Sequence, residues 1–145
     1  MTSVFPRSFL TGGLLALALA CCLPAQAFLA ELNAEHDPSR RADMALAFAF
    51  DAFDSARDGY LRGNTEQGDS QLENMTSALN VCVDSLEIMH KARFYKKPEL
   101  RVSYLQRRMA ALLEDIELPR RGWAEQMSRK LDEIHDKLLA GALRK

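Results

Sequence analysis

Apolar residues recur in alternating steps of three and four along three long stretches of this chain. This spacing places them on one face of an α-helix and predicts amphipathic helices over residues 65–91, 98–117 and 120–143. A β-strand would alternate with a period of two, and no segment is typical of one. The predicted buried faces are Leu72, Met75, Leu79, Cys82, Leu86 and Met89; Val102, Leu105, Met109, Leu112 and Ile116; and Ala124, Met127, Leu131, Ile134 and Leu138.

A further helix is predicted ahead of these, over residues 38–61. Asp37 before Pro38 is a typical helix start, and Gly63 is a typical stop. Asn64 is placed to cap the next helix, which would then start at residue 65. Alternatively, Gly68 delays the start of regular helix to near residue 70. The apolar face of the 38–61 helix is broad enough to contact more than one neighbour. Its positions are Met44, Leu46, Phe48, Ala49, Phe50, Phe53, Ala56 and Tyr60.

The connections between the four predicted helices are short, at Gly63, at residues 94–97 and at residues 118–119. Short connections force consecutive helices to run antiparallel. We therefore expect an all-α, up-down-up-down four-helix bundle made of two helical hairpins, in a single domain over residues 28–145. Hairpins of two subunits could bury the same faces, so a homo-oligomer is the alternative. Residues 28–37 are expected to form an N-terminal arm or a short helix.

Residues 1–27 have the order of a secretory signal peptide. Arg7 precedes an apolar run over residues 9–23, and the small-residue pattern of a cleavage site ends at Ala27. The run is about 15 residues long, shorter than the roughly 20 that a membrane-spanning helix needs. We expect cleavage after Ala27 and an exported protein, periplasmic or secreted. A lipid anchor at Cys21 and an uncleaved anchor are the alternatives.

The charge of the chain is divided unevenly between its two halves. Residues 31–90 carry 4 basic and 12 acidic side chains, whereas residues 91–145 carry 14 basic and 8 acidic ones. Such a division can indicate a surface that binds polyanions. The formal net charge of the whole chain is only −1. This near-neutral total favours the alternative interpretation, in which two oppositely charged hairpins dock on each other.

The most distinctive segment is residues 91–97, where four cations flank two aromatic rings. Charge combined with an aromatic face would suit an anionic membrane or an anionic envelope polymer. In the alternative interpretation, the two rings plug the end of the bundle while the cations stay in solvent. We do not expect a nucleic acid partner. The residues selected for partner binding are Arg93, Phe94, Tyr95, Lys96 and Lys97.

Two acid-x-x-His pairs have a spacing that metal sites use: Glu87 with His90, and Asp132 with His135. Di-iron bundles carry Glu-x-x-His on two helices, with all ligands pointing inward. Here each pair falls one position beside the predicted apolar face, on the flank of the bundle. A metal-binding bundle that uses these four residues is the alternative function, and ordinary boundary histidines are the default.

The sequence contains no motif of a nucleophilic hydrolase, a phosphate-binding loop or a haem-attachment site. Cys82 falls on a predicted apolar face, so we expect a buried, inert thiol. We therefore expect no cofactor and no enzymatic activity. The sequence favours an exported helical protein that binds a partner, either an unidentified protein or an anionic envelope component, through its surface.

Overall fold

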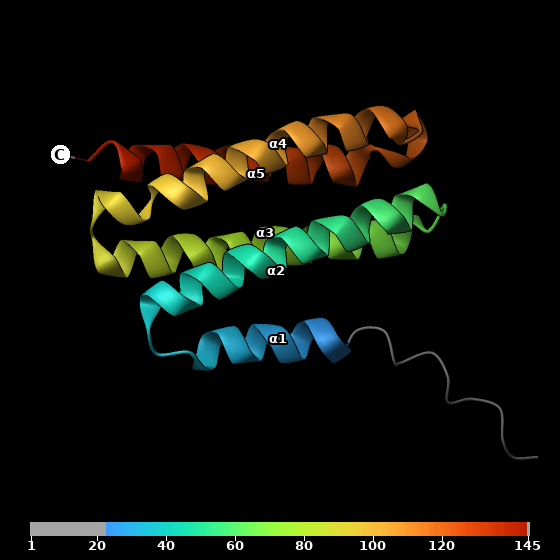
Figure 1. Cartoon of the computed structure of the whole chain (residues 1–145). Coiled ribbons are helices and arrows are strands. Elements are labelled where there is room, and N and C mark those ends of the chain that lie inside the picture. Colours follow the sequence, from blue (N-terminus) through green and yellow to red (C-terminus); the bar gives the residue numbers. More distant parts are fainter. Residues whose placement is uncertain (1–22, 145) are drawn as a thin grey trace, which may run out of the picture.

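The computed structural model describes residues 23–144, with side chains from residue 27 onward (Figure 1). The described residues form five α-helices, and two of the connections contain a turn of 3₁₀-helix. No strand occurs in this part of the chain, so the predicted all-α class is confirmed. The elements are α1 (Leu23–Ala34), α2 (Pro38–Leu61), α3 (Thr65–Met89), η1 (Ala92–Phe94), α4 (Lys96–Asp115), η2 (Leu118–Arg120) and α5 (Gly122–Ala142).

Side-chain caps fix the starts of α2 and α3. The Asp37 carboxylate accepts a hydrogen bond from the backbone N–H of Ser39 at 2.9 Å. The Asn64 side chain accepts one from Gln67 at 3.1 Å. Each cap satisfies a donor that has no partner within the helix. α3 therefore starts before Gly68, and that glycine does not delay the helix. The other predicted boundaries agree with the structure to within about two residues, the usual uncertainty of helix ends.

The five helices stack in three layers (Figure 1). α2 and α3 form one antiparallel hairpin, α4 and α5 form a second, and the hairpins meet chiefly through α3 and α5. α1 lies against α2 and α3, on the side of the first hairpin away from the second. One end of the molecule therefore holds the ends of α3 and α5 and the start of α4. The α2–α3 and α4–α5 turns lie at the other end.

The apolar faces predicted for α3, α4 and α5 are buried together. Every predicted position on them is buried except Met89, which is partly buried. A fully buried Leu, Ile or Met side chain contributes roughly 1.5–3 kcal/mol of transfer free energy. Across the two hairpins, the Thr76 hydroxyl lies 3.7 Å from the Met127 sulfur. The two hairpins therefore share one buried interior.

Of the apolar positions predicted for α2, Leu46, Ala49, Phe53 and Ala56 are buried, and several small residues that were not predicted are buried with them. Phe50 and Tyr60, which were also predicted on this face, are only partly buried. α2 and α3 approach closely, because a Cβ atom on Gly59 would lie 3.0 Å from the backbone nitrogen of Gly68. The small buried residues recur in steps of three and four along α2: Ala42, Ala45, Ala49, Ala52, Ala56 and Gly59.

The predicted N-terminal arm is a docked helix. The Phe28 ring of α1 stacks on Phe48 of α2, with centroids 4.4 Å apart. Arg41 donates hydrogen bonds to the backbone carbonyl of Glu35 at 3.2 Å and to the Ser85 hydroxyl at 2.8 Å. This single side chain therefore ties the segment after α1 to both helices of the first hairpin.

The predicted leader lies mostly outside the described residues. α1 begins at Leu23, but the side chains that dock it, such as Phe28 and the fully buried Leu32, follow Ala27. Cleavage after Ala27 would therefore leave these contacts in place. Among the helices of residues 23–144, none has the length and apolar content needed to cross a membrane.

Candidate anion-binding site

Residues 90–95 connect the two hairpins at the end of the molecule where α3 and α5 end and α4 begins (Figure 1). α3 ends because His90 adopts the left-handed conformation, with φ of 49°. Glycine is the usual residue at this position, and histidine is one of the few others enriched there. The chain then extends through Lys91 and turns into η1.

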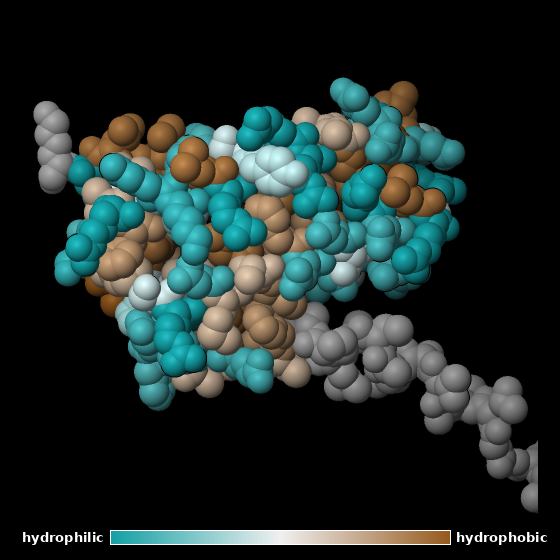
Figure 2. Space-filling model, viewed as in Figure 1, coloured by the Kyte–Doolittle hydropathy of each residue, from teal (hydrophilic) through white to brown (hydrophobic). Residues whose placement is uncertain are grey.

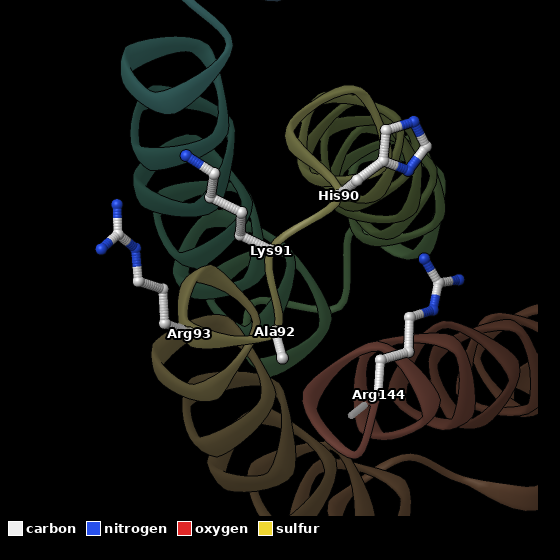
Figure 3. Close-up of a pocket in the computed structure, with 5 residues that line it drawn as sticks. All are labelled: His90, Lys91, Ala92, Arg93 and Arg144. Atoms are coloured by element: carbon white, nitrogen blue, oxygen red, sulfur yellow. The ribbon is translucent and has the colours of Figure 1, made fainter.

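The turn lines a surface cavity of about 380 Å³. Its lining residues are His90, Lys91, Ala92, Arg93 and Arg144 (Figure 3). Lys91 and Arg93 extend to one side of the connecting segment, and His90 and Arg144 lie on the other side. Among the described residues, no acidic side chain lines this cavity. Positive charges without acidic side chains between them make the local potential positive, so this surface attracts anions.

Most cations at this end have no acidic partner. Within residues 23–144, none of Lys91, Arg93, Lys96 and Arg144 forms an ion pair. All four are exposed, and their charges are left to solvent or to a ligand. Two acids lie in the helix turns at this end: Glu87 is exposed in the last turn of α3, and Glu99 in the first turn of α4 contacts His135 at 3.1 Å. We call the following set the cationic end: His90, Lys91, Arg93, Lys96 and Arg144.

The residues selected from the sequence for partner binding fall into different environments. Arg93 and Lys96 are exposed at the cationic end. The Phe94 ring is partly buried, and the Arg93 guanidinium lies over it, 4.8 Å from the ring centroid. Lys97 is exposed, but it forms an ion pair with Asp43 of α2 at 3.1 Å. The charge of Lys97 is therefore partly used within the fold.

Tyr95 requires a correction, because its side chain is only 1% exposed and cannot stack on a partner. Its ring packs on Gly141 of α5, where any Cβ atom would overlap the ring. Burial raises the pKa of the Tyr95 hydroxyl, with a lowering effect from Arg144 and a raising one from Glu87. The hydroxyl has no hydrogen-bond partner among the described residues. Tyr95 thus plugs the end of the hairpins, as the alternative interpretation expected.

Sequence reasoning misses Arg144 as a site residue. Lys91 belongs to the basic segment of residues 91–97. His90 was predicted only as a metal ligand, because of its spacing from Glu87. Arg144 is distant in sequence and lines the cavity because α5 runs antiparallel to α4. The sequence indicates this position of Arg144 only through the predicted topology. In an antiparallel hairpin, the end of the second helix lies at the same level as the start of the first.

Of the four residues predicted as metal ligands, which are Glu87, His90, Asp132 and His135, the last two contact other side chains. His135 Nε2 lies 3.1 Å from Glu99 Oε1, and Asp132 accepts a hydrogen bond from Gln106 at 2.7 Å. Both contacts join α5 to α4. Glu87 is exposed, and His90 lines the cavity. Within residues 23–144, no three His, Cys, Asp or Glu side chains are grouped so that they could hold a metal ion.

The uneven charge of the two sequence halves is partly compensated inside the fold. Lys97 pairs with Asp43 at 3.1 Å, and Arg108 pairs with Asp54 at 2.5 Å. Both pairs join the basic helix α4 to the acidic helix α2, as the docking interpretation of the charge division expected. These two ion pairs neutralise only part of the positive charge of residues 91–145. The unpaired cations of the cationic end belong to the part that remains.

A second cavity, of about 280 Å³, lies at the opposite end of the molecule. Its charged lining residues are Asp115, Glu117 and Arg120, and the last two lie 3.8 Å apart as an ion pair. The Tyr60 hydroxyl, which also lines it, donates a hydrogen bond to Asp69. This cavity therefore carries no excess of positive charge. The two ends of the molecule differ in electrostatic character.

The cationic end offers guanidinium, ammonium and imidazole groups, and among the described residues its cavity has no nucleophile or paired acid and base. Such groups suit the recognition of phosphate, sulfate or carboxylate oxygens by charge and hydrogen bonds. Against known proteins, no family model matches the chain, and neither the curated proteins nor the solved structures contain a significant match.

Proposed function

We propose that the protein is a non-enzymatic, exported helical protein that binds an anionic component of the cell envelope through its cationic end. In this proposal α2–α5 act as an up-down-up-down four-helix bundle, which provides a rigid support for the site. Export is supported by the apolar run and small-residue pattern within residues 1–27. The protein would then act in the periplasm or outside the cell.

The observation that carries the proposal is the cavity lined by Lys91, Arg93 and Arg144, to which no acidic side chain of residues 27–144 contributes. Lys97 and Arg108 of α4 have acidic partners on α2, whereas Lys91, Arg93 and Arg144 form no ion pair within residues 23–144. Leaving several cations uncompensated at one end raises the self-repulsion of the folded state. A bound anion would relieve that repulsion.

Reversing the charge of the cavity tests the proposal. We expect the Lys91→Glu/Arg93→Glu variant to bind immobilised polyphosphate or anionic lipid vesicles at least about tenfold more weakly at low salt, since each Lys or Arg near an anionic surface contributes about 1 kcal/mol. Lys97 is unsuitable for this test, because Lys97→Glu would place a second carboxylate beside that of Asp43.

The matched control carries the same charge change elsewhere. Arg129 and Lys130 lie on α5, are exposed and form no ion pair within residues 23–144. The Arg129→Glu/Lys130→Glu variant should retain most of the wild-type affinity. If both variants bind the two probes as the wild type does, or if both weaken equally, the cationic end is not the binding site.

A further inference from the structure

We propose that the anionic partner is the surface of a lipid bilayer, on which the molecule docks end-on through its cationic end. This inference rests on the proposed function and names its partner. It is carried by three exposed aliphatic side chains that accompany the cations at that end: Ile88, Leu100 and Leu143.

These three side chains are unusually open to solvent and lie close to the same end. Ile88 is 58% exposed, Leu100 is 67% exposed and Leu143 is 72% exposed. Ile88 lies in the last turn of α3, Leu143 follows the last residue of α5, and Leu100 lies about one turn into α4. Since a helix rises about 1.5 Å per residue, all three lie within roughly 8 Å of that end along the helix axes.

Two of the three aliphatic residues have a member of the cationic end as a near neighbour in the chain. Leu143 precedes Arg144, and Ile88 lies two residues before His90. On a bilayer, Lys and Arg hold their charges at the phosphate level while aliphatic side chains enter the boundary of the acyl region. A soluble polyanion would engage the cations but would leave the aliphatic side chains in water. The combination therefore favours a lipid surface.

Exposed hydrophobic residues occur toward both ends of the molecule (Figure 2). At the opposite end, Leu61 is 55% exposed and Leu118 is 76% exposed. Leu61 lines the cavity that also holds Asp115, Glu117 and Arg120, and Leu118 follows Glu117 in the chain. Arg120 is already paired with Glu117, and an anionic surface would repel the carboxylate of Asp115. Charge complementarity thus selects between two ends of similar apolar exposure, and it selects the cationic end.

Vesicle binding of the full chain tests the inference, with wild type and variants prepared alike so that any contribution of residues 1–27 is common to all. The probes are phosphatidylcholine vesicles with and without phosphatidylglycerol, and immobilised polyphosphate. We expect Ile88→Ser/Leu143→Ser to weaken binding to the anionic vesicles about tenfold and to leave polyphosphate binding unchanged. The matched control, Leu61→Ser/Leu118→Ser, should bind the vesicles as the wild type does.

The outcomes separate the two proposals. If Ile88→Ser/Leu143→Ser binds anionic vesicles as tightly as the wild type, lipid docking is overturned. The proposed function then stands only if Lys91→Glu/Arg93→Glu still weakens polyphosphate binding. If that charge reversal affects neither probe, the proposed function fails as well.

The orientation has its own readout. Trp123 is the single tryptophan and lies in the first turn of α5, about 30 Å from the cationic end along a helix of 21 residues. Anionic vesicles should leave its emission unchanged. In Trp123→Phe/Leu143→Trp, the relocated indole should shift to shorter wavelength on the same vesicles. The opposite pattern would mean that the other end of the molecule meets the bilayer.

Discussion

Cys82 is buried on α3, and its surroundings change its chemistry. Burial raises the pKa of the Cys82 thiol from 9.0 to about 12, and the carboxylate of Asp43 acts in the same direction. The thiolate is the reactive form of cysteine, so a thiol that keeps its proton is inert. The expectation of a buried, inert thiol, drawn from the place of Cys82 on an apolar helix face, agrees with this environment.

We expect Cys82 to react with a thiol reagent at least about a hundredfold more slowly in the native chain than in the denatured chain. The measurement uses Cys21→Ser/Cys22→Ser, in which Cys82 is the only thiol. The unfolded thiol ionises near pH 9.0, whereas the folded one keeps its proton up to about pH 12. The free energy of unfolding should therefore fall as pH rises between these values. Equal reaction rates in the two states would contradict the burial.

Single residues also show where sequence reasoning fails. Leu and Met mark a buried face reliably because their burial is strongly favourable, whereas alanine does not. Ala45 is buried and Ala47 is exposed, although the two side chains are identical and each has little apolar surface. The alanine face of α2 was therefore missed in part. The prediction that Tyr95 binds a partner is wrong for a related reason. The burial of its ring depends on Gly141, which lies far away in the sequence.

Helix boundaries were predictable because their causes are local. The caps at Asp37 and Asn64 act on N–H groups two and three residues away, so the sequence contains the whole interaction. α1 was expected only as an arm or a short helix. Its first residues overlap the predicted leader, and its docking side chains meet partners in other helices, such as Phe48.

Docking of α1 should be an independent local event. Leu32 is the fully buried side chain of α1, and Leu32→Ala truncates it. We expect the free energy that holds α1 in its docked position to fall by roughly 2–5 kcal/mol, or by its whole value if that value is smaller. Hydrogen exchange should accelerate in residues 28–34 and stay unchanged in α3–α5. The matched control is Asn33→Ala, which alters an exposed neighbour. Faster exchange throughout the molecule would show that α1 is part of the cooperative core.

For the whole molecule, the candidate site exists only because of the topology. The basic segment after α3 was visible in the sequence, but Arg144 joins it through the antiparallel course of α5. The same folding removes Lys97 and Arg108 from the free positive charge, because each pairs with a carboxylate of α2. A sequence reports the total charge, and the fold decides which charges remain available.

Cohesion of the two hairpins should come from the shared interior, with ion pairs as a minor contribution. Asp54 is more than half exposed, so Asp54→Asn should cost only about 0.2–1 kcal/mol, and salt should reduce that cost. Met127 is fully buried, so Met127→Ala should cost roughly 2–5 kcal/mol. Denaturant unfolding of the full chain measures both, followed by helicity and by Trp123 fluorescence.

The two probes should give one coincident transition in the wild type and in both variants, because α3 and α5 share their buried faces. Separate transitions would mean that the hairpins fold independently and that the interface is weak. A cost for Asp54→Asn as large as that for Met127→Ala would mean that charge holds the hairpins together. In that case high salt would separate the two hairpins. The fold that carries the cationic end would then depend on ionic strength, as anion binding does.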